Sequence, residues 1–410
     1  MKKPPPPLAA YLPFLGALAL AAAAAYLRLA GLDPLPAAEQ AALDPRQNAE
    51  AVVLYQKALR LDNANPYRWA DFAEALANIG QTTKARLAFA RALDLGPHIP
   101  AVRLRLVNFL LLHDPPAALP HAAKVLEAVP DYDPILFRFL DAAISPPSRI
   151  LDAIGGQPRA LRSWLLHLIA TNQPAAAQLA WQRLLAQKLA TPDHASAYVD
   201  YLLRQQQFAA ASQSWAAFLG RASGDYPSRN LIFNAPFSLY TGSPYTGVPS
   251  IATQPRQPSH GSGPLDWHFA PESEDFLVTY EPGLLKIRFE GKTNVNAELA
   301  WQTVVLPHSG AYRLSASVST DQITTNEGLR LTIQDLGLVS ESIIGSVAAT
   351  PIHLSFSVPA PRTVRIAVVR RPSEKFDNKI EGVALVRDLL LISLGSPPGP
   401  YHSPRSRGAK

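Results

Sequence analysis

The sequence of 410 residues contains no cysteine, and this absence excludes several kinds of chemistry. Disulfide bonds, thiol nucleophiles and cysteine-based zinc sites all require that residue. The 10 histidines form no His-Glu-x-x-His zinc motif, and the chain has no Gly-x-Ser-x-Gly nucleophile elbow and no phosphate-binding loop. We therefore expect no catalytic residues, no metal site and no cofactor.

A dense stripe of Lys and Arg with interleaved aromatic residues is also missing, although the net charge is +6. Because such a stripe is typical of nucleic-acid-binding proteins, we do not expect nucleic acid as a partner. The hydrophobic fraction of 48% is that of a folded chain. The length is sufficient for two or three domains.

An uncharged apolar stretch runs from Leu8 to Leu27, directly after Lys2, Lys3 and a run of prolines. About 20 apolar residues span a bilayer core of about 30 Å. The positive-inside rule then places the N-terminus in the cytoplasm and residues 31–410 on the periplasmic or extracytoplasmic side of the inner membrane. The alternative is a cleaved signal peptide, whose apolar region usually has about 7–15 residues. The longer stretch here favours an uncleaved, single-pass anchor.

Helical periodicity dominates residues 46–220, and one spacing recurs there. Ala51 and Tyr55 lie 34 residues before Ala85 and Phe89, and Trp181 lies 34 residues before Trp215. Small residues let two antiparallel helices approach closely, and aromatic residues fill the groove towards the next pair. The residues that we expect to pack the repeats are Trp69, Ala73, Gly80, Ala85, Phe89, Ala92, Pro97, Trp181 and Trp215.

On these residues the segment resembles the tetratricopeptide-repeat family, with about five repeats and an irregular centre over 101–128 and 134–156. The resemblance implies a solenoid that binds a protein partner. Six arginines could form a basic binding surface on the front of this solenoid, and the alternative is that they are simply solvated surface residues. They are Arg60, Arg68, Arg86, Arg91, Arg103 and Arg105.

Residues 221–396 have the pattern of a β-sandwich with eight or nine strands. We expect a first strand at 230–240 and then a long loop at 241–264, rich in Pro, Ser, Gly and Thr. Two hairpins are expected, the first through Pro282-Gly283 and the second through 307–310. The remaining strands are expected at 328–336, 352–359, 363–371 and 383–394.

Within this half, Leu299–Pro307 followed by Gly310–Ser315 resembles the hairpin of galactose-binding-like jelly rolls, a group that includes many carbohydrate-binding modules. The closing strand Val383–Leu394 resembles the last strand of that group. In this resemblance Trp301 and Tyr312 belong to the core or rim packing. The combination of anchor, repeats and jelly roll, with Leu-Asp-Trp at 265–267 and a Gly-Leu strand at 283–291 that is one residue longer, also resembles membrane-anchored bacterial proteins that accompany exopolysaccharide or envelope assembly.

The segment LDWHF raises the question of what Trp267 does. Strand alternation places its side chain on the same face as Leu265 and Phe269, which is typical of a buried face. The alternative is a rim aromatic that stacks on a sugar ring, with Asp266 and His268 beside it. Three acidic residues follow, which would either form a turn or offer oxygen ligands to a structural calcium: Glu272, Glu274 and Asp275.

These patterns predict a multidomain protein with an N-terminal transmembrane helix, an all-α tetratricopeptide-like solenoid and a C-terminal all-β jelly-roll sandwich. The expected segments are a cytoplasmic tip and anchor (1–30), a linker (31–45), helical repeats (46–220), a sandwich (221–396) and a disordered basic tail (397–410). We expect a non-enzymatic scaffold that binds a protein through the repeats and a glycan through the sandwich. The alternatives are a scaffold without sugar binding, and a glycan-active enzyme whose paired carboxylates meet only in space.

Overall fold

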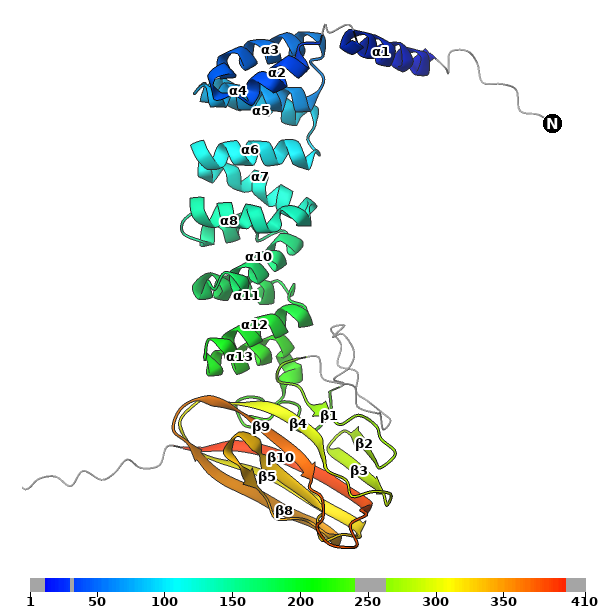
Figure 1. The fold of residues 1–410 in the computed structure, drawn as a ribbon. Helices are drawn as coiled ribbons and strands as arrows, with labels where there is room; N and C mark the ends of the chain where they lie inside the picture. The colour runs from blue at the N-terminus through cyan, green and yellow to red at the C-terminus, as the bar shows by residue number, and fades with distance from the viewer. Residues whose placement is uncertain (1–11, 30–32, 240–262, 396–410) are drawn as a thin grey trace, which may run out of the picture. The chain divides into compact units, whose positions relative to one another are not determined.

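A computed structural model describes residues 12–29, 33–239 and 263–395 (Figure 1). The expected loop 241–264, apart from its last two residues, and the expected tail 397–410 lie outside these ranges. The chain divides into two compact units, residues 1–167 and 168–410. This division differs from the boundary at 220 that the sequence suggested, because the last helices group with the sandwich.

Twelve helices of eight or more residues, and one of seven, occupy the described part of the chain before the strands. They are α1 (Leu12–Leu29), α2 (Leu35–Ala42), α3 (Asn48–Leu61), α4 (Pro66–Asn78), α5 (Thr82–Leu95), α6 (Pro100–His113), α7 (Pro115–Ala128), α8 (Asp133–Ala143), α9 (Ser148–Ile154), α10 (Pro158–Ala170), α11 (Pro174–Ala186), α12 (Pro192–Arg204) and α13 (Phe208–Leu219).

Helix α1 covers most of the apolar stretch that the sequence assigned to the membrane, and residues 8–11 of that stretch lie outside the described ranges. Within those ranges we find no helix that is both long enough and apolar enough to cross a membrane.

Proline and asparagine set the helix starts. Six helices, among them α4, begin at a proline, whose fixed φ suits the first helical turn and whose missing N–H would have no partner there. At α4 the side chain of Asn65 also accepts a hydrogen bond from Tyr67 N. The helix is followed by Gly80 with a positive φ of 77°.

The residues expected to pack the repeats divide into two groups. Ala73, Ala85, Phe89, Ala92, Trp181 and Trp215 are buried. Trp69 is partly exposed and donates to Asn63 O, while Gly80 and Pro97 are exposed at turns. Helix α9 has only 7 residues. This short helix accounts for the loss of the 34-residue spacing over 134–156, whereas α6 begins 34 residues after α4.

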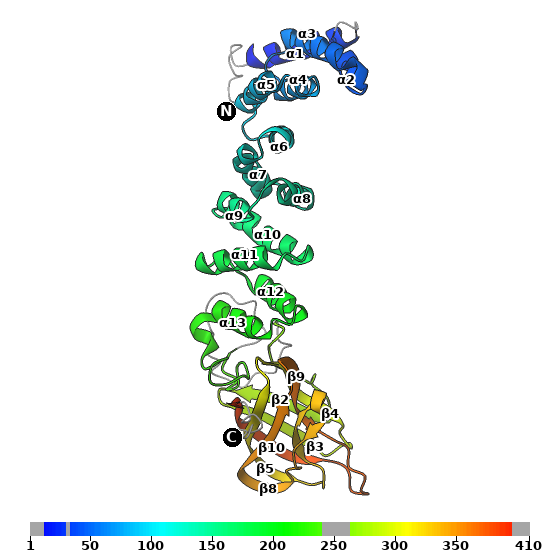
Figure 2. The ribbon, with the colours of Figure 1, turned by 90° about the vertical axis from the view of Figure 1, so that its left-hand side faces the viewer.

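Ten strands form two antiparallel sheets of five strands each within residues 263–395 (Figures 1 and 2). One sheet has the order β1-β4-β9-β6-β7 and the other β2-β3-β10-β5-β8. The strands are β1 (His268–Phe269), β2 (Phe276–Glu281), β3 (Leu284–Glu290), β4 (Ala297–Leu306), β5 (Gly310–Ile323), β6 (Leu329–Ile333), β7 (Leu338–Val339), β8 (Gly345–Val358), β9 (Arg362–Arg370) and β10 (Glu381–Gly395).

The hairpin through Pro282-Gly283 is confirmed, since β2 pairs with β3 and Glu281 lies opposite Leu284. The second expected hairpin is wrong. Strand β4 pairs with β1 and β9, whereas β5 pairs with β8 and β10 in the other sheet. The connection is therefore an arch between sheets, and the buried Tyr312 stabilises it by donating to His308 O at 2.6 Å.

The expected first strand at 230–240 is also wrong, because residues 230–239 form an irregular segment. Asn234 and Phe237 have positive φ values of 48° and 51°, which interrupt an extended chain. The side chain of Asn234 bonds both N and O of Leu239 and holds the resulting bend. The apolar residues of this segment still enter the core, which explains why its sequence resembles a strand.

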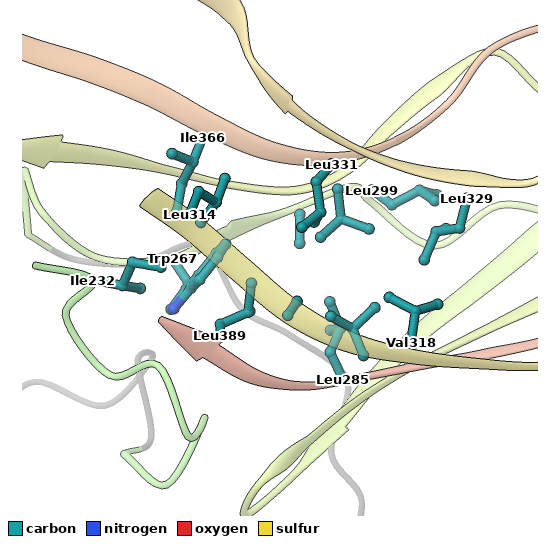
Figure 3. Packing of buried hydrophobic residues seen from close by; sticks show 14 of the residues in the cluster. Ile232, Trp267, Leu285, Leu299, Leu314, Val318, Leu329, Leu331, Ile366 and Leu389 are labelled. Atoms are coloured by element: carbon teal, nitrogen blue, oxygen red, sulfur yellow. The ribbon is translucent and has the colours of Figure 1, made fainter. Parts of the chain in front are cut away.

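The hydrophobic core lies between the two sheets, and Trp267 is one of its largest side chains (Figure 3). Strand β8 is the last strand of its sheet among the described residues, with Pro351 exposed near its middle. The described part of β8 and its partner β5 thus form a long, twisted edge of the sandwich.

Candidate functional site

An aromatic and charged cluster lies on the solvent side of the sheet β1-β4-β9-β6-β7. Trp301 of β4 is partly exposed there, while its neighbour Gln302 is buried and donates to Phe233 O inside the domain. A β-bulge between Glu298 and Ala300 shifts the alternation of the strand. Because of this bulge Leu299 points into the core and Trp301 points out.

Two side chains flank the indole of Trp301. The ring of His268, directly opposite on β1, stacks on it with ring centres 5.6 Å apart and planes 13° apart. Arg365 of β9 places its guanidinium carbon 4.9 Å from the ring centre. Since β1 and β9 lie on opposite sides of β4, His268 and Arg365 approach opposite faces of the indole. An added ligand would therefore meet the edge of Trp301 together with these polar neighbours.

Glu298 orients the guanidinium of Arg365 through a two-pronged ion pair. The Nε–Oε1 distance is 2.9 Å and the Nη2–Oε2 distance is 2.5 Å. Gln334 donates to the same carboxylate at 2.6 Å, and Asp335 accepts from Arg365 N at 2.6 Å. Both pair members keep part of their surface in solvent, 39% for Arg365 and 23% for Glu298. Donors and acceptors of fixed direction are thus presented next to an aromatic ring.

A pocket of about 320 Å³ adjoins this cluster and shares Glu298 and Gln334 with it. Its remaining lining comes from the ends of β4, β6 and β9 and from β7: Asn296, Ala297, Thr332, Gly337, Leu338, Val339, Val369, Arg370 and Arg371. The mixture of apolar walls with amide, carboxylate and guanidinium groups is typical of a small polar-ligand site. We call the cluster and this pocket together the outer-face site.

One wall of the pocket rests on Arg370, which is fully buried. Its guanidinium donates to Asn294 Oδ1 at 2.8 Å and Val295 O at 2.7 Å, and it contacts Thr325 Oγ1 and Asn378 O at 3.3 Å. Burial lowers the pKa of this guanidinium, and the charge of Glu327 opposes that effect. Arg370 therefore ties together three loops at one end of the sandwich.

The interpretation of Trp267 as a sugar platform must be corrected. Its side chain is 1% exposed and contacts Phe237 and Phe269, with ring centres 5.2 and 6.5 Å away (Figure 3). No face of the indole is open to a sugar ring, so Trp267 packs the core as the alternation of the strand indicates.

The two polar neighbours of Trp267 have separate places. Asp266 is fully buried, and its Oδ2 accepts from Gly263 N at 2.9 Å, so it closes the turn before β1 and does not face a ligand. His268 is partly exposed and belongs to the outer-face site through Trp301. The structure thus does not bring together the three candidate ligand residues in one site.

The acidic residues after β1 lead into a turn. Ser273 Oγ accepts from Asp275 N and Phe276 N, which starts strand β2. Within residues 12–29, 33–239 and 263–395, no group of three or more His, Asp or Glu side chains is arranged to hold a metal ion.

Three of the six arginines that the sequence placed on a basic front form ion pairs with carboxylates of neighbouring segments. Arg68 bonds Asp33 at 3.0 Å, Arg86 bonds Asp114 at 3.2 Å, and Arg105 reaches both Asp71 and Glu74 at 2.6 Å. Burial lowers the pKa of Arg105, but its hydrogen bonds and charge interactions with Glu74 and Asp71 raise it above the ordinary value overall. These arginines mainly hold neighbouring helices together.

Sequence reasoning did not identify Arg365 or Glu298 as site residues. Both lie in strands whose alternation was recognised, but their proximity depends on the register between β4 and β9. The only local signal was a charged residue on the polar face of each strand, which most surface strands share.

No protein-family model matches the sequence, and no curated protein matches it either. Several solved structures are similar to parts of the chain. PilF of Pseudomonas aeruginosa is 17% identical, with 46% of this chain and 76% of PilF covered and a TM-score of 0.25. A CBM4 structure is 12% identical, covering 40% of this chain and 99% of that one, with a TM-score of 0.26. A carbohydrate-binding module of Cellvibrio mixtus lichenase 5A, in complex with cellotriose, is 14% identical, covering 25% and 78%, with a TM-score of 0.14.

Proposed function

We propose that the protein is a non-catalytic scaffold of cell-envelope or exopolysaccharide assembly. In this proposal the helical repeats bind a protein partner and the outer-face site of the sandwich binds a glycan. The apolar segment 8–27 anchors the chain in the inner membrane, with the bulk of the protein on the periplasmic or extracytoplasmic side.

The observation that carries the glycan part is the Trp301–Arg365–Glu298 arrangement beside its pocket. Sugar hydroxyls both donate and accept hydrogen bonds, so a guanidinium and a carboxylate held in fixed orientation can bind a vicinal pair of them. The apolar part of the pocket wall, with Leu338, Val339 and Val369, suits the C–H face of a pyranose. Trp301 and Glu298 lie on β4 and Arg365 lies on the neighbouring strand β9, so paired strands hold all three side chains.

The test is binding of the full chain to a panel of bacterial and plant polysaccharides. We expect at least one polysaccharide to bind, and Trp301→Ala or Glu298→Gln to weaken binding by about 10-fold, equivalent to about 1.4 kcal/mol. Phe376→Ala removes a fully exposed aromatic of the same domain and serves as the matched control. Thermal melts identify any variant that fails to fold.

Equal binding by wild type and both site variants would contradict the outer-face site as the glycan site. Absence of binding to the whole panel would favour the second candidate function, a scaffold that contacts only protein. One observation favours that candidate, namely that His268 and Arg365 already cover both faces of the Trp301 ring.

A further inference from the structure

A second pocket, of about 440 Å³, lies in the helical unit formed by residues 1–167. It is lined by residues before and within α6, by the last turns of α7 and by the residue preceding α10, helices that are labelled in Figure 2. The lining residues that carry its chemistry are Arg103, Lys124, His98, Glu127 and Gln157.

Arg103 differs in its partners from four other arginines of this unit. Arg68, Arg86, Arg105 and Arg159 each bond a carboxylate. Arg103 donates only to neutral acceptors among the described residues, namely His121 Nδ1 at 3.2 Å and Pro97 O at 2.5 Å. Burial lowers its pKa, and no acidic side chain opposes that effect. A guanidinium has five N–H donors, so several remain available to a ligand.

The pocket lining contains one acidic side chain, Glu127. Glu127 Oε2 accepts from Ala160 N at 3.2 Å, at the start of α10. Lys124 is exposed and forms no ion pair within 4 Å among the described residues. Burial lowers the pKa of His121 most, and the charges of Arg103 and Lys124 lower it further. The positive field of both cations therefore reaches the imidazole ring. The pocket lining therefore has two cations, Arg103 and Lys124, against the single carboxylate of Glu127, which leaves a net charge of +1.

Gln157 adds an acceptor to these donors. Its Oε1 is buried and has no hydrogen-bond partner among the described residues. A buried acceptor without a partner costs free energy, which a ligand N–H would recover. A peptide with an acidic residue offers both complements, a carboxylate for Arg103 and Lys124 and an amide N–H for Gln157.

We propose that this pocket binds an acidic side chain of a partner protein, with Arg103 and Lys124 holding the carboxylate and Gln157 accepting from the partner's backbone. This inference rests on the proposed protein-binding role of the repeats and names the chemistry of the partner. It does not depend on the glycan part, because the pocket and the outer-face site share no residue.

The experiment measures binding of the full chain to a fluorescein-labelled peptide of alternating serine and glutamate, and to the same peptide with glutamine in place of glutamate. We expect the acidic peptide to bind and the glutamine peptide to bind at least about 10-fold more weakly. Arg103→Gln and Lys124→Gln should each weaken binding of the acidic peptide by about 10-fold. Because Lys124 is exposed, its variant keeps the test valid if Arg103→Gln does not fold.

Arg91→Gln removes the same charge from the exposed side of α5, outside the pocket, and should leave the affinity within about 2-fold. An equal loss in Arg91→Gln would overturn the proposal, because binding would then follow net charge. Inorganic phosphate that binds in an Arg103-dependent way while the acidic peptide does not would also overturn it. Unchanged peptide binding in both Arg103→Gln and Lys124→Gln would contradict the pocket as the binding site. It would not contradict protein binding elsewhere on the repeats.

Discussion

The backbone of Gly263 packs against the indole ring of Trp215. A Cβ placed on Gly263 would stand 2.5 Å from Trp215 Cη2 and 2.7 Å from Cζ2. Trp215 belongs to the last repeat helix, α13, and also meets the ring of Phe233 edge-on at 5.9 Å. The turn that Asp266 closes therefore packs one end of the sandwich against helix α13. This contact is one reason why α11–α13 and the strands belong to one compact unit.

Gly263→Ala should destabilise this unit by about 1–3 kcal/mol, because the added methyl group overpacks a contact with a fully buried ring. Urea denaturation followed by circular dichroism measures the change. Gly156→Ala is the control, since a Cβ at Gly156 meets nothing within 4 Å. Identical unfolding midpoints for Gly263→Ala and wild type would show that the turn moves away from α13 without cost.

Removing the last helices should damage the sandwich. A fragment of residues 221–395 exposes the surface that Trp215 covers, including Phe233, whereas residues 168–395 retain it. We expect the longer fragment to unfold cooperatively and the shorter one to melt at a clearly lower temperature. Calorimetry of the two fragments distinguishes these outcomes, and equal melting temperatures would contradict the role given to α13.

Trp267→Ala should destabilise the sandwich by about 3–5 kcal/mol, since it empties a fully packed position. If the variant folds at low temperature, its polysaccharide binding should match that of wild type. A selective loss of binding with unchanged stability would restore Trp267 as a ligand residue and remove it from the core.

Arg370→Ala should cost about 3 kcal/mol or more, because two buried and two partly buried acceptors lose their common donor. Arg371→Ala changes the exposed neighbour and should stay within about 0.5 kcal/mol of wild type. Limited proteolysis provides a second readout, since the loops around Asn294, Thr325 and Asn378 should be cut faster only in the first variant.

The unit that contains His121 should lose stability in mild acid. Burial, Arg103 and Lys124 lower the pKa of His121 in the folded state. The unfolded chain therefore binds more protons than the folded one as the pH falls through about 6.5, and the free energy of unfolding decreases there. Thermal melts between neutral and mildly acidic pH should show this decrease in wild type and a smaller one in His121→Asn. Parallel pH profiles would exclude His121 as its source.

The sequence predicted the features that depend on periodicity. The spacing of Ala85 and Phe89 identified buried helix positions, and alternation in LDWHF placed Trp267 inside. The features it missed depend on long-range pairing. A tight turn after Leu306 looks the same whether the chain folds back in one sheet or crosses to the other, so β4 and β5 were paired wrongly.

The outer-face site escaped prediction for a related reason. One bulge at Leu299 decides which face of β4 carries Trp301, and the register with β9 decides that Arg365 meets Glu298. Neither is encoded within a few residues of the site. The apolar segment 230–239 was wrongly predicted as a strand because its apolar residues are buried although the segment is irregular.

Strand β8 is an edge strand within residues 263–395, and an edge strand can pair with the same strand of another copy of the protein. Its 14 residues contain no Lys, Arg, Asp or Glu, the charges with which edge strands usually repel one another. Pro351 interrupts this row, because proline offers no N–H to an incoming chain. Within residues 263–395, Pro351 and the register shifts of β8 against β5 are therefore the features that oppose fibre-like stacking of one sandwich on another.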